Sequence, residues 1–150
     1  MPARLRGAEP RPDDIASLVS HWRDGRIKQA LIARTLAVRA RRPELFTAGS
    51  YEPLAISGTH AARVIGFVRR GESSIAVTLV PRIAARLLQG ASIAAEPARW
   101  ADTAFALQHD LPLIDVFSGR TVEAARAPIT VGKLFERLPF ALLVSLDLVP

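Results

Sequence analysis

The side chains that most often carry enzyme chemistry are few and scattered in this sequence of 150 residues. It has three histidines, His21, His60 and His109, and they do not form the set of three or four convergent ligands that zinc needs. There is no cysteine, and no serine stands in a Gly-x-Ser-x-Gly turn. The sequence therefore predicts no catalytic residue, no metal site and no cofactor.

Paired carboxylates are the other candidate, because two acids suffice for glycoside chemistry. No acid is flanked by the aromatic and polar residues that would shape a sugar subsite, so each is expected to be a helix cap, a turn residue or a surface charge. A carbohydrate-binding surface would instead stack sugar rings on exposed aromatic side chains. The candidates for such stacking are Trp22 and Trp100.

Composition limits the class of protein. Hydrophobic residues make up 49% of the chain and charged residues 23%, which is typical of one globular domain. The net charge of +6 comes almost entirely from arginines that are spread along the chain, so we expect no nucleic-acid partner. No apolar run is long enough to cross a bilayer, no secretory pattern opens the chain and cysteine is absent, so a cytoplasmic protein without a membrane partner is expected.

One long helix is predicted from Arg26 to Arg41, with no internal glycine or proline and with Pro43 to end it. At 100° per residue its apolar side chains fall into two stripes. The first stripe holds Ile27, Leu31 and Val38, and the second holds Ile32, Ala33, Leu36 and Ala40. Two stripes indicate contact with two bodies, and a helix wedged deeply into one core is the alternative.

The rest of the chain has the pattern of short strands. Two Val- and Ile-rich runs around a Gly- and Ser-containing turn, residues 62–82, predict a central β-hairpin covered on both faces. Further strands are expected at 51–57, 102–108, 113–124 as a second hairpin, and 140–146. The fold class is therefore mainly β, an antiparallel β-sandwich of about seven strands preceded by one long N-terminal helix.

We divide the chain into a disordered lead (1–14), a connecting helical segment (15–43) and a C-terminal β-sandwich domain (44–150). The lead holds Pro2, Pro10 and Pro12, which oppose regular structure. The predicted core of the β-domain consists of large apolar residues at alternating strand positions, namely Ile65, Phe67, Val77, Leu79, Phe105, Ile114, Leu142 and Val144.

Several segments, in order, resemble the C-terminal end of malto-oligosyltrehalose synthase, a member of the α-amylase superfamily. They are WRDGRIKQALIARTLAVRARRPELF (22–46), GSYEPLAISG (49–58), VIGFVRR with IAVTLVPR (64–82), WADTAFAL (100–107), DVFSGR (115–120) and LFERLPFALL (134–143). The resemblance implies trehalose biosynthesis, in which the reducing-end α-1,4 bond of a maltodextrin is rearranged into an α,α-1,1 bond. The family's nucleophile and general acid belong to an upstream barrel, which needs about 250 residues.

The resemblance therefore implies a non-catalytic, inactive domain whose partner is the catalytic barrel, and which meets maltodextrin only through that barrel. One helix stripe would face the barrel, and without the barrel it would favour self-association. In the family the start of the helix lies where barrel and β-domain meet, so Asp24, Arg26 and Lys28 are the candidates to face the barrel or the substrate. The alternative is a stand-alone β-module that binds α-glucan or a protein.

Overall fold

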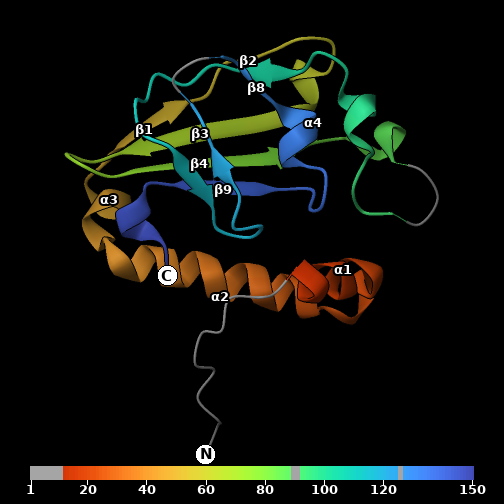
Figure 1. The fold of residues 1–150 in the computed structure, drawn as a ribbon, viewed down its shortest axis with the longest axis horizontal. Helices are drawn as coiled ribbons and strands as arrows, with labels where there is room; N and C mark the ends of the chain where they lie inside the picture. Colours follow the sequence, from red (N-terminus) through yellow and green to blue (C-terminus); the bar gives the residue numbers. More distant parts are fainter. Residues whose placement is uncertain (1–11, 89–91, 125–126) are drawn as a thin grey trace, which may run out of the picture.

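The computed structural model describes residues 12–88, 92–124 and 127–150, and side chains from residue 15 onward. Helices come first, and one long helix lies along one side of the strands that follow it (Figure 1). The helical elements of this first part are α1 (Pro12–Ser20), the 3₁₀ turn η1 (Trp22–Asp24), α2 (Arg26–Arg41) and α3 (Pro43–Thr47).

The long helix α2 has the predicted bounds. It begins after Gly25, whose φ of +85° is a left-handed conformation that glycine adopts without steric cost and that turns the chain from η1 into the helix. It ends at Arg41, and Pro43 is the first residue of α3, where a missing N–H costs nothing. The two apolar stripes are confirmed: Val38 is fully buried, whereas Leu36 on the other stripe is exposed.

Nine strands follow in the described residues and form two antiparallel sheets. The larger sheet has the order β1-β3-β4-β9-β6-β7, and the smaller has the order β2-β5-β8. The strand bounds are β1 Ser50–Pro53, β2 Ile56–Ser57, β3 Val64–Arg70, β4 Ile75–Pro81, β5 Ala104–Phe105, β6 Leu113–Asp115, β7 Thr121–Val122, β8 Ile129–Thr130 and β9 Ala141–Val144.

Among the described residues, four short helical elements lie between these strands: η2 (Ala61–Arg63), η3 (Ala85–Leu87), η4 (Pro97–Trp100) and α4 (Val131–Leu134). A fifth, η5 (Leu146–Leu148), follows β9 and lies beside α2 (Figure 1). The predicted central hairpin is confirmed as β3 and β4, with Arg70 paired to Ile75 across the turn, and the second hairpin is confirmed as β6 and β7.

The larger sheet separates two hydrophobic clusters. Buried residues of β3 and β4, such as Val68 and Val77, form the first cluster with residues of the smaller sheet, such as Phe105. On the opposite face, Leu142 and Val144 of β9 form the second cluster with Val38 of α2 and with partly buried Leu31. The first stripe of α2 thus covers the β9 side of one face of the larger sheet.

Five of the eight predicted core residues are buried: Val77, Leu79, Phe105, Leu142 and Val144. Ile65 was predicted wrongly, because it is 46% exposed, and Phe67 and Ile114 are only half-buried. The strand register places Ile65 and Phe67 on the face that α2 covers, but toward the β1 edge. The helix covers the β9 side of that face, so the prediction that the hairpin is covered on both faces was wrong there.

Other boundaries also differ from the predicted ones. Residues 51–57 are divided between β1 and β2, which belong to different sheets, and the strand at 102–108 is only two residues long in β5. Positions 1–11 of the predicted lead lie outside the described residues, and α1 begins at Pro12, before the predicted start of the helical segment. That segment also continues beyond residue 43, through α3.

Candidate functional site

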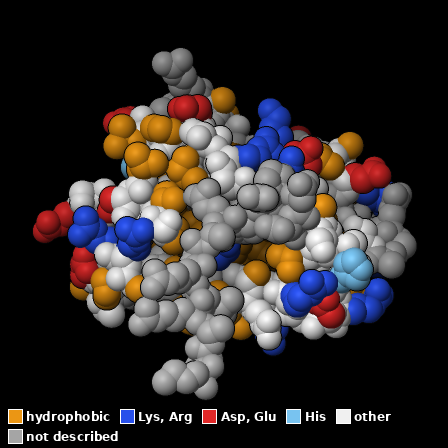
Figure 2. Space-filling view, turned by 60° about the horizontal axis from the view of Figure 1, so that its bottom comes forward, with side chains coloured by type: hydrophobic (Ala, Val, Ile, Leu, Met, Phe, Trp, Pro, Cys, Tyr) orange, Lys and Arg blue, Asp and Glu red, His pale blue; other side chains and the backbone are white. Residues whose placement is uncertain are grey.

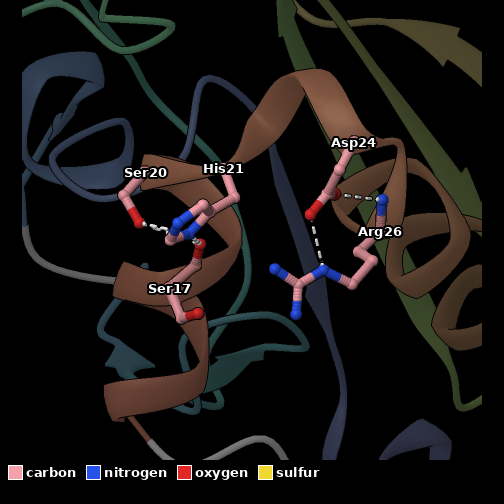
Figure 3. A network of polar contacts seen from close by, with 5 residues as sticks. All are labelled: Ser17, Ser20, His21, Asp24 and Arg26. Atoms are coloured by element: carbon pink, nitrogen blue, oxygen red, sulfur yellow. Dashed lines mark hydrogen bonds and ion pairs between the residues drawn. The ribbon is translucent and has the colours of Figure 1, made fainter.

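The start of α2 holds the three residues predicted to face a barrel or a substrate, and two of them bind each other. Asp24 Oδ1 accepts the backbone N–H of Arg26 at 2.9 Å, and Asp24 Oδ2 accepts the Nε–H of the same arginine at 2.7 Å (Figure 3). Asp24 therefore satisfies the first free amide of the helix, as carboxylates before helices commonly do. Arg26 has an ion-pair partner within its own chain.

The pKa of Asp24 lies below its ordinary value, first because the backbone N–H of Arg26 donates to the carboxylate, and second because the Arg26 side chain does so. Both groups are exposed, so water screens the pair and it contributes little to stability. Its consequence is geometric: the guanidinium is held against the preceding turn.

Lys28 lies two residues farther along α2 and is exposed. Two residues on a helix are about 200° apart, so Lys28 and Arg26 point to nearly opposite sides. Lys28 forms no ion pair with any residue in the described ranges. Lys28 thus differs from Arg26, which is paired to Asp24.

Of the two tryptophans predicted to stack on a sugar, Trp100 is buried and Trp22 is partly accessible. Trp100 is only 2% exposed and meets Phe135 edge-to-face, with ring centroids 5.2 Å apart, so its assignment as a stacking residue was wrong. Trp22 is half-buried, and the guanidinium carbon of Arg23 lies 4.5 Å from its ring centroid. Arg23 therefore covers one face of the Trp22 ring.

An exposed aromatic does lie elsewhere, on β1. Tyr51 is 58% exposed, its ring centroid lies 5.0 Å from that of half-buried Phe67, and the guanidinium carbon of Arg69 lies 5.2 Å from the same ring. The sequence predicted a strand here but not which face of it would stay open. That face stays open because α2 packs beside β9 and does not reach the β1 edge of the sheet.

The second stripe of α2 is the main exposed apolar feature of the helical part. Ile32 is 49% exposed and Leu36 is 57% exposed, with exposed Ala33 and Ala40 on the same stripe. Figure 2, which brings the lower side of Figure 1 forward, shows hydrophobic side chains at the surface between groups of Lys and Arg side chains. Large apolar side chains gathered on one surface mark sites of contact between proteins.

Two of the three histidines, His21 and His109, are described by the contacts or the burial of their rings. His21 Nδ1 lies 2.9 Å from Ser20 Oγ and 3.0 Å from the carbonyl oxygen of Ser17 (Figure 3). Burial lowers the pKa of His109, with a further contribution from the positive charge of Arg70. Among the described residues no three histidines and acids gather where they could hold a metal ion.

The comparisons with known proteins do not extend this picture. No family model, no curated protein and no solved structure matches the chain. Within the described residues, no helix is both long and apolar enough to cross a membrane. The candidate site is the exposed second stripe of α2, flanked at the start of the helix by Arg26 on one side and Lys28 on the other.

Proposed function

We propose that this chain is the non-catalytic C-terminal domain of a malto-oligosyltrehalose synthase-like enzyme, with its two sheets packed as a β-sandwich and with the cytoplasm as its compartment. In this proposal the catalytic barrel is the partner of α2. The barrel carries out the intramolecular transglucosylation that makes the trehalosyl unit, and the β-domain stabilises or completes it. The support comes from the sequence segments named above and from one structural observation.

That observation is the division of α2 into a buried and an exposed apolar stripe. Val38 on the first stripe is fully buried against the larger sheet, while Ile32 and Leu36 on the second remain half exposed. A helix that served only this domain would need one stripe. An apolar second stripe costs solubility unless a second body covers it, and the resemblance supplies the barrel as that body.

The test is to mix the chain with a malto-oligosyltrehalose synthase barrel that lacks its own C-terminal domain. Calorimetry should detect a complex, and isomerase activity should rise on mixing. Leu36→Asp should weaken the complex at least tenfold, because a charge would be buried on the apolar stripe. Leu111→Asp, which changes a leucine that is 66% exposed in the loop between β5 and β6, should not. Equal effects of the two variants, or no complex with the unaltered chain, would overturn the proposal.

The alternative is a stand-alone module that binds α-glucan or a protein, and exposed Tyr51 beside Phe67 is the observation in its favour. The two functions differ in what the chain does alone. As a barrel-dependent domain it should neither bind maltopentaose nor convert it into a non-reducing product. Saturable binding of maltopentaose that Tyr51→Ala abolishes would support the module instead.

The second stripe of α2 also predicts how the isolated chain behaves at high concentration. With Ile32 and Leu36 exposed, copies of the chain should associate through this stripe. Sedimentation equilibrium should detect the association, and Leu36→Asp should reduce it while Leu111→Asp does not. Adding the barrel should compete with it, because both partners would use the same stripe.

A further inference from the structure

A cavity of about 290 Å³ lies where the end strands of the two sheets approach each other. Its walls come from β7, which ends the larger sheet, from β8, which ends the smaller one, and from α4 and the turn after it. Each of these strands is only two residues long. The cavity is far in sequence from the start of α2 and independent of the proposed function.

The free edges of end strands present backbone N–H and C=O groups that have no strand partner. Apolar side chains form part of the cavity wall, among them half-buried Val122 of β7, buried Ile129 of β8 and half-buried Leu134 of α4. A ligand here would meet apolar surface and backbone polar groups together, as small molecules do in most protein pockets.

Three cations line the cavity: Arg120, Lys133 and Arg137. Arg120 Nη1 donates to Glu136 Oε2 at 2.9 Å and to the backbone carbonyl of Lys133 at 3.3 Å, and so ties the β6–β7 turn to α4. Lys133 and Arg137 are exposed and form no ion pair within the described part of the chain. These two side chains are therefore available to bind an anion.

Two acids also line the cavity, and they differ in their partners. The Asp115 carboxylate is buried and accepts hydrogen bonds from the Ser118 hydroxyl and, at 3.3 Å, from the Phe117 N–H, so it is used within its own turn. Glu123 is exposed and forms no ion pair with a described residue. A carboxylate beside two cations suits a ligand that carries hydroxyl donors as well as an anionic group.

We propose that this cavity binds a small hydroxylated organic phosphate, with the phosphate held by Lys133 and Arg137 and a hydroxyl group held by Glu123. Lys and Arg are the side chains that proteins use for phosphate, Arg because its planar fork matches two oxygens. The described lining contains no aromatic ring, which argues against a nucleobase or a stacked sugar face. The volume is at the small end for ligand pockets, which argues against a polymer.

The test uses the full chain and ribose 5-phosphate as the probe, with inorganic phosphate and ribose as comparison ligands. Titration followed by amide NMR should move the signals of Thr121, Thr130 and Lys133. Ribose 5-phosphate should bind more tightly than inorganic phosphate, and ribose should not bind. Lys133→Gln combined with Arg137→Gln should weaken the binding of ribose 5-phosphate at least tenfold. Glu123→Gln should reduce the preference for ribose 5-phosphate over inorganic phosphate, because only ribose 5-phosphate has hydroxyl groups that can donate to the carboxylate.

The matched control removes two positive charges elsewhere: Arg41→Gln with Arg82→Gln, both exposed positions outside the cavity lining. It should bind ribose 5-phosphate as the unaltered chain does. An equal loss in the control would mean that net charge alone attracts the phosphate and would overturn the site. Equal affinity for ribose 5-phosphate and inorganic phosphate would overturn the role given to Glu123, and the absence of shifts at the cavity amides would overturn the whole proposal. Because all the substituted side chains are exposed, these variants should fold, and the shifts in the unaltered chain test the site without any variant.

Discussion

Arg34 and Val116 are 82 positions apart in the sequence, yet the Arg34 guanidinium donates to the Val116 carbonyl oxygen at 2.7 Å. The bond joins the middle of α2 to the residue that follows β6 and is partly buried. The Arg34 side chain lies next to the apolar stripe with which α2 packs on the larger sheet. The bond therefore fixes the position of α2 along the sheet, while the apolar contacts set the distance between helix and sheet.

Replacing Arg34 by Met should keep most of the apolar contact of the side chain and remove this bond. A hydrogen bond to a charged group is worth about 1.5 to 3 kcal/mol, so the free energy of unfolding should fall by about that amount. Urea denaturation measures the change. Arg41→Met is the control, because Arg41 is exposed on the same helix. Equal losses in both variants would show that the fall in stability comes from removing a positive charge from α2 and not from removing the bond to Val116.

The two faces of the larger sheet should respond differently to truncation of a large side chain. Leu79 is fully buried in the cluster between the sheets, so Leu79→Ala should cost about 2 to 5 kcal/mol through lost burial and a cavity. Phe67 is half-buried beside exposed Tyr51, so Phe67→Ala should cost at most about 2 kcal/mol. Denaturant melts of both variants decide this, and a larger loss for Phe67→Ala would mean that its face is covered in solution.

This contrast shows what the sequence could predict and what it could not. The β3–β4 hairpin, the bounds of α2 and its two stripes follow from local patterns of residues, and they were predicted. Which part of a sheet face a helix covers depends on contacts between distant segments, such as Arg34 with Val116. Ile65 alternates correctly for a buried strand residue and is nevertheless 46% exposed, because α2 lies beside β9 instead.

The same limit applies to the candidate site residues. Asp24 and Arg26 are close in sequence, and a local rule for helix starts could have paired them. Trp100 could not be excluded as a sugar platform from its sequence, since its burial depends on Phe135 and on the distant elements around it. The cavity between β7 and β8 carried no sequence signal, because β8 and α4 are too short to give a periodic pattern.

Asp115 should make stability depend on pH in a direction opposite to that of most carboxylates. Burial raises its pKa above the ordinary value of 3.8, although the hydrogen bonds from Ser118 and Phe117 act in the other direction. The folded state therefore holds this proton more tightly than the unfolded state does. Its contribution is fully present below pH 3.8 and is lost as the pH rises through the raised folded-state pKa.

Asp115→Asn should remove that dependence. The amide can still accept from the Phe117 N–H and can donate to the Ser118 hydroxyl, so the turn is kept. The stability of the Asn variant relative to the unaltered chain should therefore increase as the pH rises above about 3.8 and then become constant. Denaturation at a series of pH values measures the difference, in which the other carboxylates cancel. A flat curve for Asp115→Asn would contradict the prediction.

The last prediction separates Arg26 from Lys28, and it rests on the proposed barrel partner. Arg26 is bound to Asp24 at 2.7 Å, whereas Lys28 points to the other side of α2 without an ion pair among the described residues. In the chain joined to a matching barrel, Lys28→Ala should weaken the contact between the two by about three- to tenfold, as expected for an ion pair at the rim of an interface.

Arg26→Ala should leave that contact unchanged, because it removes only a pair within the chain. Isomerase activity and the melting temperature of the joined protein give the readout, with association of the separate parts as a direct check. If both variants keep the activity and the melting temperature of the parent, this segment is only a solvated helix start, and neither cation faces the barrel. If Arg26→Ala alone reduces them, Arg26 is the residue that crosses the interface, which it can do with the Asp24 pair intact because Asp24 accepts only from its backbone N–H and its Nε.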